Sequence, residues 1–217
     1  MESRAPRIKF CGVTNLDDAH RAADLGAWAI GLIFHGPSPR RCDPDAATAI
    51  VAALRRRLEI FGVWVNRPLD EVAELADATG VTGLQLHGDE GPVFCGELAR
   101  RTGCKVMKAA RVRSRADVQA LRAFSTDYHL LDSSARGLPG GTGETFDWSL
   151  VSSRRRGPPL VLSGGLTPAN VAEAIGAVRP WAVDVASGVE AEPGRKDPDK
   201  LAAFAAAVAA TAQPEAA

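Results

Sequence analysis

Short apolar runs alternate with amphipathic stretches from one end of the chain to the other. Apolar residues dominate eight runs that we expect to form strands, at 7–12, 28–34, 60–66, 83–88, 105–110, 128–132, 160–163 and 182–186. Between these runs the apolar positions recur with helical spacing. This spacing predicts helices at 16–25, 44–57, 70–79, 92–101, 115–124, 146–152, 169–178 and 198–212. Strands that alternate with helices are typical of a parallel sheet.

Eight strand–helix pairs predict an α/β fold, the closed (β/α)8 TIM barrel. Several runs are apolar at nearly every position, as expected for strands buried on both faces. An open doubly wound sheet is the alternative, but it normally carries a glycine-rich fingerprint in its first strand–helix turn. Here that turn reads CGVTNL, with one glycine. We therefore expect a single domain over 1–217, with frayed ends at 1–6 and 213–217.

Capping residues indicate where several helices begin. Asp43–Pro44 and Asp197–Pro198 each place an N-cap before a proline at the first helical position. Thr167–Pro168 has the same form. Thr14 and Asp17 have capping-box spacing, which predicts Thr14 as the cap of the first helix.

Composition narrows the classes of partner. The chain has 217 residues, 46% hydrophobic and 24% charged, and its 26 Lys and Arg balance its 26 Asp and Glu. Nucleic acids and anionic membranes attract a surplus of basic residues, so we expect neither as a partner. The longest apolar stretch, 201–212, is shorter than the roughly 20 residues of a membrane span.

The N-terminus and the cysteines indicate where the protein is located. The N-terminus has no apolar signal core. The four cysteines form no CxxC pair and no metal-ligand cluster. We therefore expect a cytoplasmic protein with reduced thiols and no metal site.

Polar residues and glycines follow the predicted strands, where a (β/α)8 barrel carries its chemistry. They are Cys11, Arg40, Asn66, Gln85, His87, Lys108, Arg111, Asp132, Gly164, Gly165, Asp184, Ser187 and Gly188. Cys11 and Asp132 are candidates for proton transfer. A thiol has a reference pKa near 8.5 and a carboxyl near 3.9, so each needs tuning to act as base or acid near neutral pH.

The same residues also have structural interpretations. Cys11 can be a small buried residue, and Asp132 or Asp184 can be a hydrogen-bonding group of the core. His87 is either a site residue, facing the same way as Gln85, or a core histidine. The other cysteines, Cys42, Cys95 and Cys104, read as structural.

Two glycine-rich turns indicate an anion site. Gly164 and Gly165 follow the seventh strand, and Ser187 and Gly188 follow the eighth. Glycine lets backbone N–H groups approach an anion, and these two loops often bind phosphate in this fold. A phosphorylated substrate is therefore expected, although such glycines can also serve only to make tight turns. We interpret the third glycine-rich segment, 137–146, as a mobile loop that can act as a lid.

Seven segments together resemble the phosphoribosylanthranilate isomerase family. They are KFCGVT (9–14), GLIFHGPSPR (31–40), GVWVN (62–66), LQLHGDE (84–90), LLDSSARGLPGGTGETFDW (130–148), SGGLTPANV (163–171) and DVASGVEAEPGRKD (184–197). The match runs in order from residue 8 to about 204. There are two minor departures. Ala186 stands where the family often has a second serine, and His35 stands where it often has tyrosine.

The resemblance implies an Amadori rearrangement in tryptophan biosynthesis. N-(5-phosphoribosyl)anthranilate would become 1-(2-carboxyphenylamino)-1-deoxyribulose 5-phosphate without metal or cofactor. By the same resemblance, Cys11 is the base and Asp132 the acid. Arg40 would pair with the anthranilate carboxylate, and Asp184 would orient the amine or the ribose hydroxyls. Gln85 and His87 would line the pocket, while Gly164, Gly165, Ser187 and Gly188 would hold the phosphate.

Two other functions stay open at this point. One is the related phosphoribosyl-formimino isomerisation of histidine biosynthesis, alone or in a bifunctional enzyme. Enzymes of that kind resemble a duplicated half-barrel with Asp at the end of strand one, where this chain has Cys11. The other is a non-catalytic barrel that only binds a phosphorylated ligand. The sequence leaves open the choice between monomer and dimer, with a monomer favoured.

Overall fold

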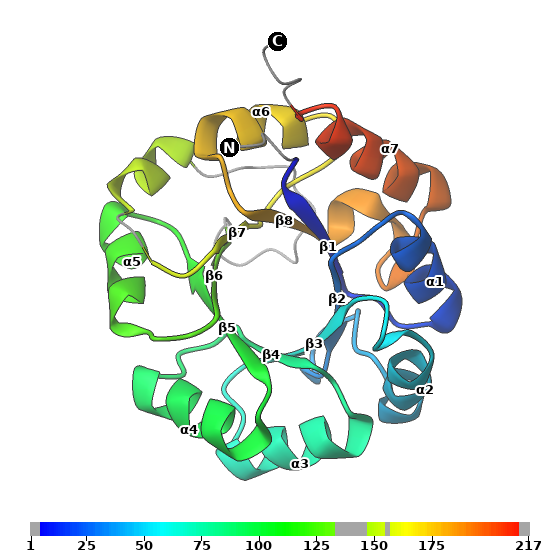
Figure 1. The fold of residues 1–217 in the computed structure, drawn as a ribbon, viewed down its shortest axis with the longest axis vertical. Helices are drawn as coiled ribbons and strands as arrows, with labels where there is room; N and C mark the ends of the chain where they lie inside the picture. The colour runs from blue at the N-terminus through cyan, green and yellow to red at the C-terminus, as the bar shows by residue number, and fades with distance from the viewer. Residues whose placement is uncertain (1–4, 133–146, 155–156, 213–217) are drawn as a thin grey trace.

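The computed structural model describes residues 5–132, 147–154 and 157–212. Eight parallel strands form a closed ring within these residues, and helices surround it (Figure 1). The strands are β1 (Arg7–Cys11), β2 (Ala29–Ile33), β3 (Glu59–Trp64), β4 (Gly83–Leu86), β5 (Lys105–Arg111), β6 (Tyr128–Asp132), β7 (Leu160–Leu162) and β8 (Ala182–Val185). Pairing of β1 with β8 closes the ring and sets Lys9 opposite Asp184. The predicted (β/α)8 barrel is confirmed.

Helices follow the strands nearly as the pattern predicts. They are α1 (Leu16–Asp24), α2 (Pro44–Leu54), α3 (Leu69–Thr79), α4 (Pro92–Thr102), α5 (Arg115–Ala120), α6 (Val171–Val178) and α7 (Pro198–Ala209). The expected helix at 146–152 is the 3-10 helix η2 (Trp148–Ser153), and α5 continues as a 3-10 turn, η1 (Leu121–Ala123). The segment 137–146 lies outside the described residues.

Two helices begin at the predicted caps and two do not. The side chains of Asp43 and Asp197 accept backbone N–H groups at the starts of α2 and α7. The expected start at Thr167–Pro168 was wrong, because α6 begins at Val171 and its N-cap is Asn170. The cap of α1 is Asn15, whose Oδ1 accepts the Asp18 N–H at 2.8 Å, so the expected Thr14 cap was wrong. The Thr14 hydroxyl instead donates to the carbonyl of Gly194, 180 positions away. A distant acceptor therefore displaced a local capping interaction.

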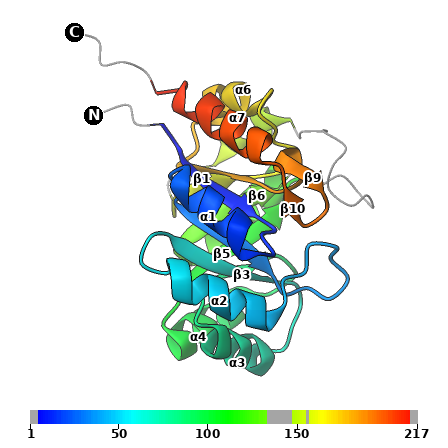
Figure 2. The same cartoon turned by 90° about the vertical axis from the view of Figure 1, so that its right-hand side faces the viewer.

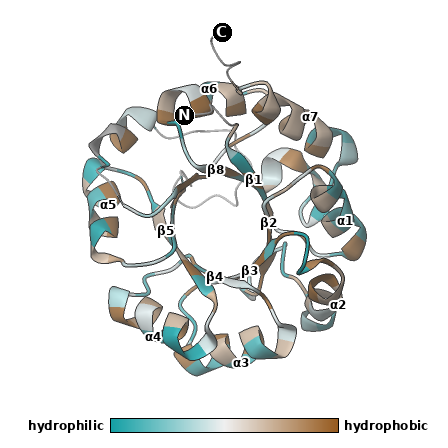
Figure 3. Ribbon diagram, viewed as in Figure 1, coloured by the Kyte–Doolittle hydropathy of each residue, from teal (hydrophilic) through white to brown (hydrophobic). Residues whose placement is uncertain are grey.

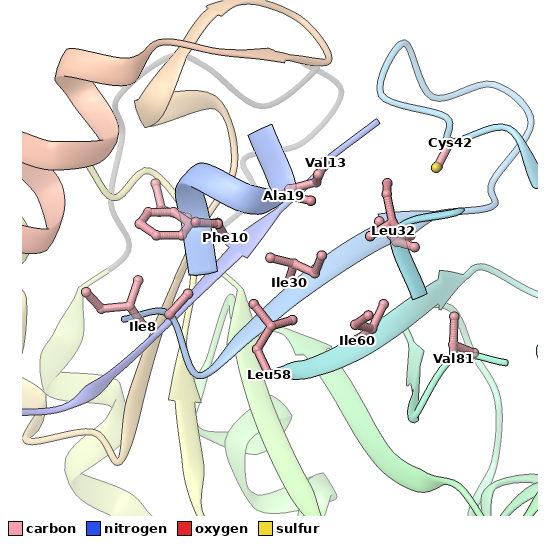
Figure 4. Close-up of a cluster of buried hydrophobic side chains, with 14 of the residues drawn as sticks. Ile8, Phe10, Val13, Ala19, Ile30, Leu32, Cys42, Leu58, Ile60 and Val81 are labelled. Carbon is pink, nitrogen blue, oxygen red and sulfur yellow. The ribbon is translucent and has the colours of Figure 1, made fainter. Parts of the chain in front are cut away.

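The core has two layers because side chains alternate across each strand. Outward-facing residues such as Ile8, Phe10, Ile30 and Ile60 pack against the helices (Figure 4). Inward-facing residues fill the barrel, among them Phe61, Met107, Leu130 and Val161. Hydrophobic colour covers much of the ring of strands, whereas the surrounding helices carry both hydrophobic and hydrophilic colour (Figure 3). Burying each large aliphatic or aromatic side chain contributes about 1.5–3 kcal/mol to stability.

A two-stranded hairpin between β8 and α7 was not predicted. It consists of β9 (Glu190–Glu192) and β10 (Arg195–Lys196), and follows the 3-10 turn η3 (Ser187–Val189). The hairpin lies at the end of the barrel opposite the start of β1 and the end of α7 (Figure 2). It therefore lies at the end where the strands finish. None of the helices in the described part of the chain is long and apolar enough to cross a membrane.

Candidate active site

The end of β1 brings a thiol next to a buried ion pair. Lys9 and Cys11 face the same way, two positions apart on the strand. The ammonium of Lys9 donates to Asp184 Oδ1 at 2.8 Å, and Ser163 Oγ donates to Asp184 Oδ2 at 3.1 Å. All of the Lys9 side chain and nearly all of that of Asp184 is buried. The predicted site residues Cys11 and Asp184 therefore share one cluster, in which Lys9 lies between them.

Glycine on the neighbouring strand makes this cluster possible. A Cβ atom at Gly31 of β2 would lie 2.7 Å from Cys11 Sγ and 3.1 Å from Lys9 Nζ. A Cβ atom would clash with the thiol and crowd the ammonium, so glycine at this position leaves room for both groups.

Burial and neighbouring charges act in opposite directions on the pKa of Cys11 and on that of Lys9. Burial raises the pKa of the Cys11 thiol, and Asp184 adds to this, while the cations Lys9 and Lys196 oppose it. Burial alone would lower the pKa of Lys9, but Asp184 and Cys11 outweigh it and the pKa is raised. Lys9 therefore stays charged beside Cys11. A fixed positive charge favours the thiolate, the form in which a cysteine removes protons.

Across the ring, three predicted residues form one hydrogen-bonded chain. The Gln85 amide nitrogen lies 3.1 Å from His87 Nδ1, and His87 Nε2 lies 3.0 Å from Asp132 Oδ2. Gln85 belongs to β4, His87 follows it, and Asp132 ends β6. Gln85 is buried, whereas His87 and Asp132 are partly exposed. The acid candidate is thus held from the barrel wall on a different side from Cys11.

The β9–β10 hairpin ties the thiol's strand to the loop that carries Arg40. Lys196 Nζ donates to the carbonyl of Cys11 at 2.6 Å, to that of Ala186 at 3.0 Å and to Glu190 Oε1 at 3.0 Å. Glu190 also accepts Nε and Nη2 of Arg40, at 2.9 and 2.8 Å. One buried carboxylate therefore fixes two cations, and the hydrogen bonds of the described residues leave Nη1 of Arg40 unused.

The two glycine turns lie against each other. Gly164 and Gly165 have φ values of +93° and +62°, which favour glycine. A Cβ at Gly188 would lie 2.0 Å from the carbonyl oxygen of Leu166. In the described part of the chain, no backbone acceptor takes the N–H of Gly164 or of Gly165. These N–H groups can bind an anion between the loops after β7 and β8.

A cavity of about 340 Å³ opens beside the histidine. Its lining includes His87, Lys108, Arg111 and Phe124. The Lys108 ammonium is already bound, to Glu90 Oε2 at 2.8 Å and to the carbonyl of Gly88 at 2.7 Å. Lys108 therefore holds the loop after β4. This space adjoins the predicted site on the side away from the glycine turns.

Sequence reasoning missed Lys9, Glu190 and Lys196. All three lie inside the segments that carry the family resemblance, and Lys9 shares a strand face with Cys11. Their positions in those segments were a usable signal. Their partners were not readable, because the contacts join residues up to 185 positions apart.

Comparisons with known proteins agree with this geometry. Residues 8–207 match the family model of N-(5'-phosphoribosyl)anthranilate isomerase. The protein of that name from Geobacter metallireducens is 43% identical over 91% of this chain and 96% of its own length.

Solved structures give the same result. Phosphoribosyl anthranilate isomerase from Thermotoga maritima is 38% identical, with a TM-score of 0.84 over 94% of this chain and 98% of that one. A structure of the isomerase with reduced 1-(o-carboxyphenylamino)-1-deoxyribulose 5-phosphate, also 38% identical, has a TM-score of 0.80 over the same shares. The chain belongs to the N-(5'-phosphoribosyl)anthranilate isomerase family.

Proposed function

We propose that this chain isomerises N-(5'-phosphoribosyl)anthranilate in tryptophan biosynthesis, with Cys11 as the base and Asp132 as the acid. The observation that carries the proposal is the placement of these two groups. They lie on separate walls of one barrel mouth, within a chain whose residues 8–207 match the isomerase family.

The reaction uses one proton transfer at each of the two groups and then a tautomerisation, in which C1' gains a proton and the 2'-hydroxyl loses one. Asp132 protonates the ribose ring oxygen, the C1'–O bond breaks, and the nitrogen lone pair forms the C=N bond of a Schiff base. The Cys11 thiolate then removes the C2' proton to give an enolamine, which tautomerises to the ketone. General acid–base catalysis of this kind contributes about 10²–10⁴-fold to each step.

Lys9 and Asp184 support the base. The ammonium of Lys9 stabilises the thiolate, and Asp184 holds Lys9 in place. The resemblance assigned Asp184 to the substrate amine or hydroxyls. Each of its oxygens already accepts one hydrogen bond, from Lys9 or from Ser163. A carboxylate oxygen accepts two, so Asp184 retains capacity for a substrate hydroxyl.

The remaining roles concern binding. Gly164, Gly165, Ser187 and Gly188 bind the substrate phosphate through backbone N–H groups. Arg40 offers Nη1 to the anthranilate carboxylate, while Glu190 holds its other edge. Such a charge-assisted contact is stronger than a neutral hydrogen bond.

A few expectations about the surroundings of the protein stay predictions. We propose a phosphorylated small molecule as its partner, with neither nucleic acid nor membrane. We further propose the cytoplasm as its location and a monomer as its state.

The test is a coupled assay with phosphoribosylanthranilate, followed by the loss of its fluorescence. The purified chain should consume the substrate, and Asp132→Asn should lower kcat far more than it raises KM. Asparagine keeps the size of the side chain but has no acidic proton to transfer to the ring oxygen in the transition state. Asp17→Asn on the exposed side of α1 is the matched control. An inactive wild-type chain would overturn the function, and an unchanged kcat in Asp132→Asn would overturn the acid role alone.

A further inference from the structure

The side chains of Gln85 and His87 connect Asp132 to the wall of the barrel. Gln85 is 1% exposed, so its amide is enclosed by the barrel wall. His87 lies between this amide and Asp132, with one ring nitrogen at 3.1 Å and the other at 3.0 Å from its partners. The ring therefore has a hydrogen-bond partner at each nitrogen.

The amide of Gln85 has an unused oxygen. Within the described residues, Gln85 Oε1 is buried and accepts no hydrogen bond, while Nε2 faces His87 Nδ1. A half-turn of the Gln85 amide exchanges its oxygen and its nitrogen. Gln85 Oε1 then accepts a hydrogen bond from a proton carried on His87 Nδ1. In the doubly protonated ring, the second proton lies on His87 Nε2 and faces the Asp132 carboxylate. Gln85 can thus accommodate a ring that carries one proton or two.

An aspartate alone is a poor proton donor at neutral pH. With its reference pKa near 3.9, a carboxyl group holds a proton on only about one molecule in a thousand at pH 7. An imidazole in contact with the carboxyl group gives the pair a second place to hold that proton.

We propose that His87 and Gln85 are positioning residues for Asp132, and that the His87–Asp132 pair holds the proton that opens the ribose ring. The inference rests on the proposed function. The proton passes from His87 Nε2 to Asp132 and from Asp132 to the ring oxygen. The C1'–O bond breaks, and the nitrogen lone pair forms the C=N bond. The pair is left with a neutral imidazole and a carboxylate, one proton fewer.

Other charged groups around His87 come from neighbouring elements. Lys108 and Arg111 of β5 line the same cavity, with Arg113 and Asp117 beyond them and Asp89 in the loop of His87 itself. Of these, Lys108 is paired with Glu90, and Asp117 accepts the backbone N–H of Arg113. Asp132 is the acidic group in hydrogen-bond contact with the ring. The experiment must therefore separate its influence from that of the surrounding charges.

The first experiment reads the ring directly, without substrate. The chain has four histidines, so labelling histidine with ¹⁵N gives a small set of ring signals that His87→Gln assigns. We expect the pH at which His87 changes between one and two ring protons to fall by about one unit in Asp132→Asn, because a carboxylate favours the imidazolium. An unchanged transition would overturn the proposal.

The second experiment measures kcat against pH. In His87→Gln, the side-chain amide can still donate to Asp132 but cannot carry an extra proton. We expect kcat to fall about 10- to 100-fold at pH 8 and KM to change little, since acid catalysis contributes about 10²–10⁴-fold in total. The deficit should narrow as pH falls, because solvent then supplies the missing proton. A deficit of the same size at every pH indicates a purely structural role and would overturn the proposal.

A companion variant should move the ¹⁵N transition of His87 in the opposite direction. Gln85→Glu places a carboxylate against His87 Nδ1, which favours the doubly protonated ring. We expect the ¹⁵N transition of His87 to move to higher pH in this variant, and circular dichroism to establish that it is folded. If Gln85→Glu does not fold, the transition in Asp132→Asn still decides the matter. His20→Asn, on α1 outside the site, is the control and should match the wild type.

The two experiments separate this inference from the proposed function. If the wild-type chain does not consume phosphoribosylanthranilate, the ring signals still report whether His87 and Asp132 share a proton. If the chain is active but His87→Gln keeps its kcat at every pH, the function stands and the relay is wrong.

Discussion

The two ends of the barrel are built from opposite kinds of side chain. At the end where the strands begin, Trp28 packs against the rings of Trp181, Phe61 and Tyr128, with centroids 4.7, 5.6 and 5.1 Å away. Arg7 covers this group, with its guanidinium 4.4 Å from the ring of Trp181. At the end where the strands finish, the inward positions hold the Lys9–Asp184 pair and the chain from Gln85 to Asp132.

This difference separates stability from chemistry. Aromatic rings bury a large area and close the barrel, which stabilises the fold without requiring charges in the interior. The charged groups at the opposite end lose their hydration on burial. Their partners of opposite charge offset this desolvation penalty. We expect substitutions at the finishing end to change turnover or binding, and substitutions at the starting end to change the free energy of unfolding.

The largest expected effect is at Cys11. Cys11→Ala should lower kcat by about 10²–10⁴-fold, the contribution of a general base, with the fold intact by circular dichroism. Because burial raises the pKa of this thiol, the thiolate fraction of Cys11 should increase with pH until the thiol is titrated. Cys104→Ala, a half-buried cysteine outside the site, is the control. A folded Cys11→Ala with wild-type turnover would return Cys11 to a packing role.

At the opposite end, Trp28→Ala should act on stability alone. Removing a ring in contact with three others should lower the free energy of unfolding by about 2–4 kcal/mol, somewhat less than for a fully buried tryptophan. Urea unfolding measures the loss, and Trp28→Phe, which keeps a ring, should lose less. The comparison between the two ends fails if Trp28→Ala keeps its stability but loses kcat in the folded protein.

A smaller effect is expected at the glycine turns. Gly165→Asp should weaken inhibition by inorganic phosphate more than tenfold, because a carboxylate would repel the bound anion. At about 4 Å the repulsion of two unit charges is roughly 4 kcal/mol at an effective dielectric of 20, and solvent reduces it.

Gly165→Asn is the matched control for this substitution. Gly165 has a φ of +62°, so either side chain imposes the same backbone strain, and only aspartate adds charge. Equal inhibition constants for the two variants would place the phosphate elsewhere on the barrel.

The smallest expected effect is at Arg40. Arg40→Lys keeps a positive charge next to Glu190 but loses the planar group that can serve two partners. We expect KM to rise about fivefold with kcat nearly unchanged, which corresponds to one hydrogen bond of about 1 kcal/mol. Arg41→Lys, an exposed neighbour, should leave KM unaltered. A normal KM in Arg40→Lys would mean that Arg40 only anchors the β9–β10 hairpin.

Local patterns determined much of this molecule. The eight apolar runs predicted every strand of the ring, because strands buried on both faces must be apolar almost throughout. The Asp–Pro pairs predicted the starts of α2 and α7, because an N-cap interaction needs only neighbouring residues. The order of strands then placed Cys11, His87 and Asp132 at the same end of the barrel, since the carboxyl ends of parallel strands share one edge.

Only the tertiary structure decided which of these groups contact one another. Closure of the ring pairs Lys9 with Asp184, 175 positions away, and the β9–β10 hairpin brings Glu190 to Arg40 across 150 positions. The α1 cap shows the same limit, because Thr14 binds Gly194 and leaves Asn15 to cap the helix. Hydrophobic periodicity is a local property, whereas a charged side chain can pair with any opposite charge that the closed barrel brings within reach. The sequence therefore determined which residues reach the mouth of the barrel, and the closed ring determined their partners.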